Sequence, residues 1–154
     1  MEKESKMRII ELENLFKKEE TLNKVLEMLQ EDFDKTDYWS GVRKMNLTDN
    51  SEEINKALNE LSGVYSNLRT ALGIAETVKR NREVRYKESI RAETENAGNK
   101  YTDSKASTQA SAHVANYRRV RNIIEAYCES CDKHIITLQS ILKDLNKDYK
   151  HPQG

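Results

Sequence analysis

YRRVRNIIEAYCESCDKHIITLQSILKDLNKDY, residues 117–149, decides the fold, because apolar side chains recur through it at intervals of three and four residues. This spacing places them on one face of an α-helix. No Gly or Pro occurs between Ser104 and Tyr149, so the stretch predicts one helix of about 45 residues, about 68 Å long at ~1.5 Å per residue. A helix of that length either projects from a compact domain or packs against other subunits. We call its apolar face, from Ile124 to Leu145, the C-terminal seam.

Both cysteines of the chain, Cys128 and Cys131, lie in this seam, and His134 follows three residues later. A structural zinc site usually takes four ligands from two separated pairs, and the chain has no second cysteine pair. A Cys-x-x-Cys redox motif needs a βαβ setting, and no strand pattern is present. Free cysteine is commonly buried like a small apolar residue. We therefore expect core positions and no cofactor; metal shared across a dimer is the open alternative.

The composition predicts an all-α protein. Of 154 residues, 34% are charged, five are Gly, and the one Pro is Pro152 in the tail, so little in the chain interrupts a helix. The length fits one domain, and the few large apolar residues predict an elongated bundle, with a long C-terminal helix, that is assembled into an oligomer. We divide the chain into an acidic N-terminal helical region with a connecting loop, residues 1–50, and a helical hairpin core, residues 51–150.

Within the first region, helical spacing of apolar residues covers roughly 3–34, with a weak point at residues 17–20 where Thr21 can cap a new helix. Residues 35–50 break the spacing and hold the only Trp, so we expect a connecting loop or a short irregular cover there.

A capping signal at residues 49–53 begins the next helix. Its apolar stripe runs from Ile54 to Ala75, and a polar break at residues 93–104, rich in Asn and Gly, predicts the turn that precedes the final helix.

Net charge is zero overall but is distributed unevenly. Residues 1–62 carry 10 Lys/Arg and 15 Asp/Glu, a balance of −5, whereas residues 63–154 carry 16 and 11, a balance of +5. This asymmetry is typical of a protein whose basic part binds a polyanion. Attraction between the two parts of the chain explains it equally well.

The stripe of the second helix becomes cationic where its rhythm continues to Lys79, Arg82 and Tyr86. Guanidinium groups bind phosphate through a rigid fork, and aromatic rings stack on unpaired bases. The pattern therefore favours single-stranded nucleic acid over a plain solvated surface held by pairs such as Glu83 with Lys87. The candidate nucleic-acid-binding residues are Lys79, Arg80, Arg82, Arg85, Tyr86, Lys87, Arg91, Tyr117, Arg118, Arg119 and Arg121.

Residues 102–116 are small and polar, which suits either close approach of a neighbouring backbone or a poorly ordered helix start. His113 lies in this stretch with no partner evident from the sequence.

The sequence does not indicate an enzyme. It has no nucleophile elbow, no Gly-rich phosphate loop and no His-Glu-x-x-His helix. It also has no apolar run of the ~20 residues that a membrane helix needs. Because residues 1–6 are not followed by the apolar core of a signal peptide, we expect a cytoplasmic protein without a membrane partner.

The order of these features resembles a known family, the small recombination mediators of tailed phages of the UvsY type. The similarity is strongest over residues 113–145, where Tyr117, Ile124 and Ile135 have the spacing of the family's final helix. Weaker similarity covers residues 68–87. The family's basic element falls near Glu83-Val84-Arg85, where Arg85 keeps the cation but Glu83 replaces a Lys.

The resemblance implies a non-enzymatic phage protein, in the host cytoplasm, that binds single-stranded DNA and helps a RecA-like recombinase replace a single-strand-binding protein. It also implies a homo-oligomer, ring-shaped in the family, that assembles through the C-terminal helices. The residues of the C-terminal seam expected to carry this assembly are Ile124, Tyr127, Cys128, Cys131, Ile135, Leu138, Leu142 and Leu145.

The alternative hypothesis is a helical protein-interaction module, such as a phage-encoded inhibitor of a host or defence protein. The acidic N-terminal region would then be the active surface, because acidic helices compete with nucleic acid for a basic groove. A scaffold or virion component is a third possibility.

Overall fold

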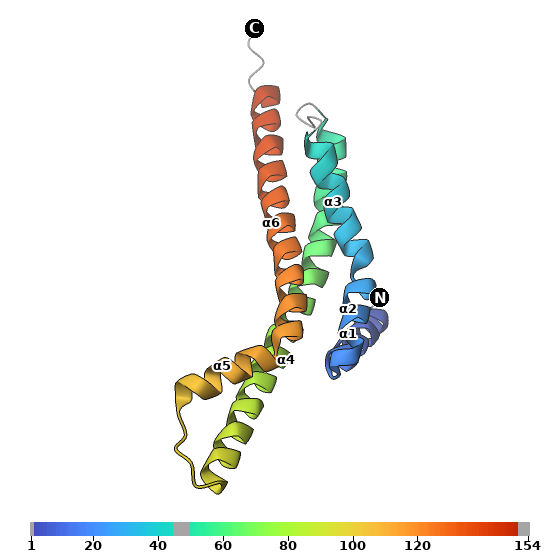
Figure 1. Ribbon diagram of the computed structural model, residues 1–154. Helices are drawn as coiled ribbons and strands as arrows, with labels where there is room; N and C mark the ends of the chain where they lie inside the picture. Colours follow the sequence, from blue (N-terminus) through green and yellow to red (C-terminus); the bar gives the residue numbers. More distant parts are fainter. Residues whose placement is uncertain (1, 45–49, 151–154) are drawn as a thin grey trace. The chain divides into compact units, whose positions relative to one another are not determined.

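The structure is a computed structural model that describes residues 2–44 and 50–150. The prediction of an all-α protein is confirmed: the described part of the chain forms six α-helices and one short 3₁₀ helix (Figure 1). Two of the helices are long, α4 with 46 residues and α6 with 36. The elements are α1 Glu2–Phe16, η1 Glu19–Thr21, α2 Leu22–Met28, α3 Gln30–Lys44, α4 Ser51–Asn96, α5 Asp103–His113 and α6 Ala115–Lys150.

The expected loop at residues 35–50 is wrong over most of its length, because α3 extends to Lys44; residues 45–49 lie outside the described part. Trp39 is buried, and its Nε1 donates a hydrogen bond to Glu60 Oε2 at 2.5 Å. Thr36 is also buried, with its hydroxyl bonded to the carbonyl of Asp32. A polar residue on the inner face hides the apolar period, so the sequence pattern alone misses this helix.

The weak point at residues 17–20 is a real helix end. Helix α1 stops at Phe16, and η1 leads into α2. Thr21 does not cap the new helix as an acceptor; its hydroxyl donates to the carbonyls of Leu15 and Lys18. The start of α4 is capped as the sequence indicates, since Asn50 Oδ1 accepts a hydrogen bond from the N–H of Glu53 at 3.2 Å.

The single final helix that the sequence predicts is interrupted at Val114, which separates α5 from α6 with φ −99° and ψ 17°. Val114 is fully buried. The side chain of Arg118 folds back and donates hydrogen bonds to Ser111, to its carbonyl at 2.9 Å and its hydroxyl at 2.6 Å. Burial of Val114 and this side-chain bond stabilise a break that no Gly or Pro announces.

The turn after α4 is where the sequence predicts it. The N–H of Gly98 donates to the carbonyl of Glu95, and the N–H of Asn99 to that of Thr94, both at 3.0 Å. Gly98 has φ 72°, a left-handed conformation that L side chains adopt at a cost. These paired bonds are the Schellman motif that commonly ends a helix.

The chain divides into two compact units. Unit 1 contains the residues up to Glu27 together with Ala71–Ile123, and unit 2 contains Met28–Thr70 together with the residues from Ile124 onward. Each unit therefore combines parts of both sequence regions, 1–50 and 51–150.

Unit 2 brings together α3, the first half of α4 and most of α6 (Figure 1). Phe33 of α3 stacks on Tyr127 of α6, with ring centroids 4.2 Å apart, and the hydroxyl of Tyr127 donates to Asp37 at 3.0 Å. The Cys131 thiol donates to the carbonyl of Leu61 in α4 at 3.2 Å. The three helices thus contact one another pairwise around an apolar core.

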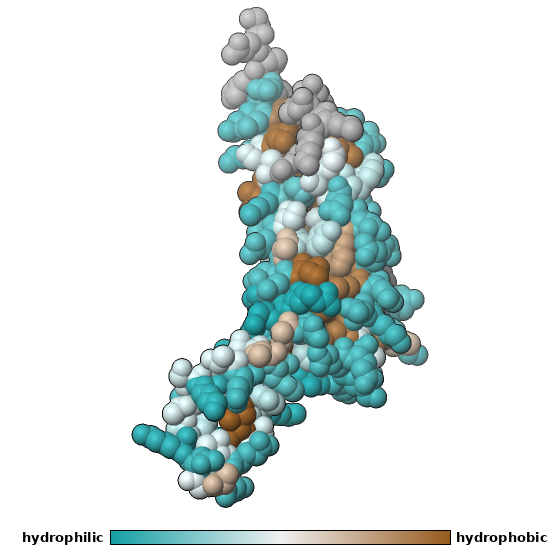
Figure 2. All heavy atoms as spheres, in the orientation of Figure 1, coloured by the Kyte–Doolittle hydropathy of each residue, from teal (hydrophilic) through white to brown (hydrophobic). Residues whose placement is uncertain are grey.

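Unit 1 contains α1, most of α2, the second half of α4, α5 and the first turns of α6. Phe16 and Val25 contribute to its core from the N-terminal helices, and Tyr117 and Val120 from α6. No residue of α4 after Ala75 is buried. The remainder of α4 is paired with α5 through the hairpin and keeps much of its surface exposed; hydrophilic side chains dominate the face seen in Figure 2. No helix of the described part is long and apolar enough to cross a membrane.

Candidate nucleic-acid interface

The cationic stretch of α4 lies in unit 1, on the part of the helix that follows the last buried residue. Lys79, Arg82 and Tyr86, which continue the apolar stripe, are half-buried, whereas Arg80 and Arg85 are exposed. Long side chains can cover apolar surface with their stems and keep the charge in water. The buried positions of α4 therefore end where its sequence turns basic, and the charged groups lie at the surface of this unit.

Four of the nine candidate cations form ion pairs with carboxylates of their own chain. Three of these pairs are short: Lys87 with Asp103 at 2.7 Å, Arg121 with Glu76 at 2.8 Å, and Arg91 with Glu95 at 3.0 Å; Lys79 and Glu83 are 3.8 Å apart. The hydrogen bond from Lys87 lowers the pKa of the Asp103 carboxyl, and the same bond raises the pKa of Lys87. The charge of these four cations is balanced locally.

Three further cations bond to neutral groups. Arg82 donates to the backbone carbonyl of Lys17, Arg118 to Ser111, and Arg119 to Asn23 Oδ1 at 2.9 Å. A neutral acceptor orients a guanidinium without cancelling its charge. Arg80 and Arg85 make no ion pair or hydrogen bond within residues 2–44 and 50–150. Five of the nine candidate cations, all arginines, therefore have no ion pair with a carboxylate of the described residues.

The two candidate aromatic residues differ in access. Tyr117 is 2% exposed and lies under the guanidinium of Arg82, 4.5 Å from the ring centroid. Burial raises the pKa of its hydroxyl. Tyr86 is half-buried and stacks on His113, with centroids 3.9 Å apart and planes 5° apart. His113, which has no evident partner in the sequence, therefore has an aromatic one, and Tyr86 has the more accessible of the two tyrosine rings.

Two cavities of unit 1 meet at the Tyr86–His113 stack, since both residues line both cavities. One, of about 620 Å³, carries three cations and no carboxylate in its lining; we call it the basic cavity. It is lined by Lys17, Val78, Asn81, Arg82, Arg85, Tyr86 and His113.

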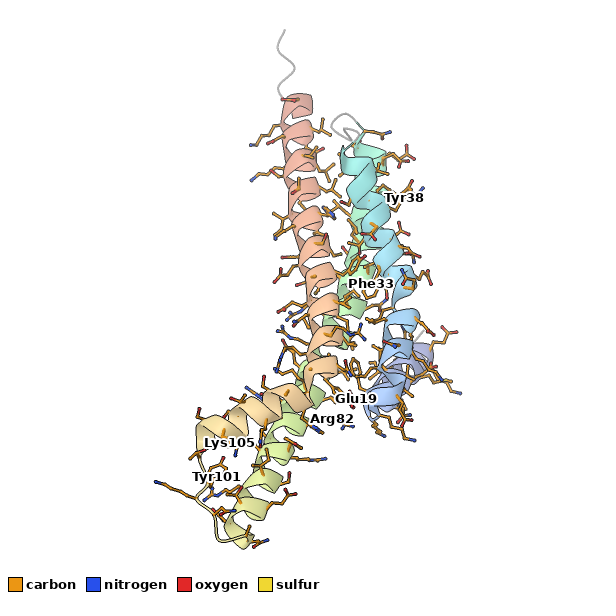
Figure 3. The ribbon with its side chains drawn as sticks, viewed as in Figure 1. Glu19, Phe33, Tyr38, Arg82, Tyr101 and Lys105 are labelled. Atoms are coloured by element: carbon orange, nitrogen blue, oxygen red, sulfur yellow. The ribbon has the colours of Figure 1, made fainter. Side chains whose placement is uncertain are left out.

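The other, of about 600 Å³, lies between the end of α4, the turn and α5; we call it the hairpin cavity. Tyr101 from the turn and Lys105 from α5 line it and are labelled in Figure 3.

Sequence reasoning missed several residues of these cavities. Lys17 belongs to the basic cavity although it lies 65 residues from Arg82, to which its carbonyl is bonded. Lys100, Tyr101 and Lys105 line the hairpin cavity. A cation beside an aromatic residue in the predicted turn was a usable signal for Lys100 and Tyr101, whereas nothing in the sequence pattern links Lys17 to the basic stretch.

Much of the C-terminal seam packs inside unit 2. Ile124, Cys128, Cys131 and Leu138 are buried within one chain. The remaining seam residues are half-buried; they are Tyr127, Ile135, Leu142 and Leu145. Half-buried residues occur along the whole seam, but after Leu138 both remaining seam residues are half-buried, so its end keeps surface for a neighbouring subunit.

The cysteines are free thiols in the core of unit 2. Burial raises the pKa of Cys131 to about 12 and also raises that of Cys128. His134 is buried beside Ser130, with Oγ and Nε2 3.4 Å apart. Within the described ranges, no three His, Cys, Asp or Glu side chains are grouped so that they could hold a metal ion.

No family model, curated protein or solved structure matches this chain.

Proposed function

We propose that the protein is a non-enzymatic binder of single-stranded DNA and that unit 1 carries the binding surface. The basic cavity is the observation on which this proposal rests, because it gathers Lys17, Arg82 and Arg85 without a lining carboxylate. Such a cavity attracts phosphate, and the rigid guanidinium fork suits its oxygens.

The proposed binding mode follows from which partner, if any, each cation has within the chain. Arg80 and Arg85 contact phosphates directly, because no carboxylate of the described chain competes for them. Arg82, Arg118 and Arg119 add positive potential from fixed positions. Lys79, Lys87, Arg91 and Arg121 contribute less, since a phosphate would have to displace their carboxylate partners. Tyr86 is the candidate for stacking, because Tyr117 is covered by Arg82.

The finer proposal, a recombination mediator, is supported by the resemblance to the UvsY-type proteins. In that role the protein holds single-stranded DNA while a RecA-like recombinase replaces a single-strand-binding protein. Assembly into a homo-oligomer raises avidity by repeating weak sites along one strand. The corresponding measurement is whether the protein accelerates recombinase filament assembly on DNA coated with single-strand-binding protein.

DNA binding is tested by fluorescence anisotropy of a labelled single-stranded oligonucleotide over a salt series. If about four phosphates are neutralised per chain, log affinity falls with log salt at a slope of about −3, at ~0.7 per phosphate contact. We expect Arg80→Gln with Arg85→Gln to weaken binding about tenfold or more at low salt and to reduce the slope by about 1.4.

The matched control is Lys147→Gln, which removes a cation of α6 that is paired with Asp144 in unit 2. It changes net charge in the same direction but removes no proposed contact, so affinity and slope should stay close to those of the wild type. Absence of binding at low salt, or a salt-independent affinity, would contradict the proposal.

The alternative, a protein-interaction module acting through the acidic N-terminal region, has one supporting observation. Met7 and Ile10 of α1 are 64% and 57% exposed, on a helix that also presents Glu4 and Glu11. Exposed apolar side chains among acids suit a partner with an apolar strip and basic rim. A partner that loses affinity for Met7→Ser with Ile10→Ser, together with no DNA binding by the wild type, would favour this alternative.

A further inference from the structure

The hairpin cavity has a different chemistry from the basic cavity. Its aromatic lining residues are Tyr86, Tyr101 and His113, and its amides are Asn99 and Gln109. Its volume of about 600 Å³ is within the range of roughly 300–1,000 Å³ that small-molecule sites occupy. Aromatic faces and amides together are what a nucleobase needs, because rings stack on its plane and amides bond to its edge.

The cavity is open because small residues form one of its walls. Ala106 and Ala112 of α5 both line it. The opposite wall comes from α4, through Tyr86 and Ile90. The ion pair of Lys87 with Asp103 links α4 to the start of α5, and neither residue lines the cavity. The space is therefore built into the way α5 packs on α4.

The charges around the cavity suit a base that is attached to a phosphate chain. Lys100 and Lys105 line it together with one acid, Glu93, so the lining is positive by one charge. Across the Tyr86–His113 stack, the basic cavity adds Arg82 and Arg85. A strand whose phosphates lie in the basic cavity therefore extends past the Tyr86–His113 stack to the hairpin cavity.

We infer that the hairpin cavity receives one unstacked base of a bound single strand, which stacks on the aromatic lining beside Tyr86 while the neighbouring phosphates lie against the arginines of the basic cavity. The inference rests on the proposed DNA-binding function and adds a base-binding subsite to it. The Tyr86–His113 pair separates the two subsites, and Asn99 and Gln109 supply the polar contacts to the base edge.

The experiment compares two labelled oligonucleotides of equal length, one with bases and one with abasic sites throughout its central part. We expect the wild-type protein to bind the first about 5- to 160-fold more tightly, the range that corresponds to stacking one base on an aromatic residue. The two oligonucleotides have the same phosphates, so their salt slopes should be similar.

The informative variant is Ala112→Phe, which places a phenyl ring on the wall of the cavity, where it obstructs a bound base, and leaves every cation in place. Ala112 is exposed on α5, so the substitution should not disturb the core. We expect this variant to lose most of the preference for bases and to keep the affinity for the abasic strand. The matched control is Ala126→Phe, an exposed alanine of α6 in unit 2, which should keep the preference. Gln109→Leu gives a second test that removes an amide and keeps the volume.

The possible failures are distinguishable. If neither oligonucleotide binds at low salt, the proposed function fails and the base subsite fails with it. If both bind equally well, or if folded Ala112→Phe and Gln109→Leu variants both keep the full preference, DNA binding stands and the base subsite is wrong. Circular dichroism confirms the fold of each variant.

Discussion

The function predicted for Cys131 depends on whether the residue is considered as part of a motif or by its position on the helix. As part of Cys-x-x-Cys with a nearby His it suggests chemistry, whereas its position between Ile and Leu residues of the seam indicates packing. The side chain is fully buried and its thiol donates to the carbonyl of Leu61. Burial disfavours the thiolate, so the environment suppresses the reactivity that a redox or metal site needs.

A pH dependence of stability follows from this burial. The pKa of Cys131 is raised from 9.0 to about 12 in the folded state, so above pH 9 the unfolded chain loses this proton first. Stability is therefore fully retained below pH 9 and falls as pH rises from 9 toward 12. The measurement is the urea midpoint across this range.

The comparison variant is Cys131→Ala, whose urea midpoint should fall less over the same interval. Burial also raises the pKa of Tyr117 and Tyr127, so a residual fall is expected in the variant. Equal pH dependence in the two proteins would show that the thiol does not contribute.

At the scale of helices, boundaries follow local chemistry only where a single residue determines them. Gly98 ends α4 in the predicted place, because its positive φ suits glycine and the sequence places glycine there. Val114 breaks the final helix without such a signal, through burial and the bonds of Arg118 to Ser111. Helix α3 forms although its polar residues predict a loop, because Trp39 and Phe33 find partners on other helices.

Alanine substitution of two glycines of unit 1 should change the free energy of unfolding in opposite directions. A Cβ added at Gly98 or at Gly73 meets nothing within 4 Å, so the effect of each substitution depends on the backbone conformation alone. Gly98→Ala should lower the free energy of unfolding by about 1–2 kcal/mol, the cost of a left-handed conformation. Gly73→Ala, inside α4, should raise it by about 0.5–1 kcal/mol. Thermal or urea unfolding measures both, and the same sign for the two variants would contradict the assignment of Gly98 as the helix stop.

At the scale of the whole molecule, the two compact units contain different parts of the proposed binding and assembly surfaces. Unit 1 holds the cations and both cavities, and unit 2 holds the cysteines and the buried part of the seam. The carboxylates that pair with the four balanced cations, Glu76, Glu83, Glu95 and Asp103, all come from residues 63–154. The balance of +5 in that region already counts these four carboxylates, so the ion pairs leave the balance unchanged. They decide only where the excess positive charge lies, at cations without an ion pair such as Arg80 and Arg85.

Self-association belongs to this scale, and we expect it to depend on the end of the seam. Leu142 and Leu145 are half-buried, whereas Leu138 is 1% exposed. Leu142→Glu with Leu145→Glu should therefore lower the particle mass measured by light scattering and leave most of the unfolding free energy. Leu138→Ala should instead cost about 2–5 kcal/mol of stability. A wild-type mass equal to that of one chain would refute the oligomer.

The sequence by itself determined the all-α class, the two long helices, the glycine stop after α4 and the core positions of the cysteines. These features depend on residues close together in the chain, whose periodicity and capping chemistry are visible in the sequence. Only the tertiary structure decided which cations form ion pairs with carboxylates of the chain, that His113 stacks on Tyr86, and that Lys17 lines the basic cavity. These depend on contacts between helices, where the partner of a side chain is chosen by packing rather than by its neighbours in sequence.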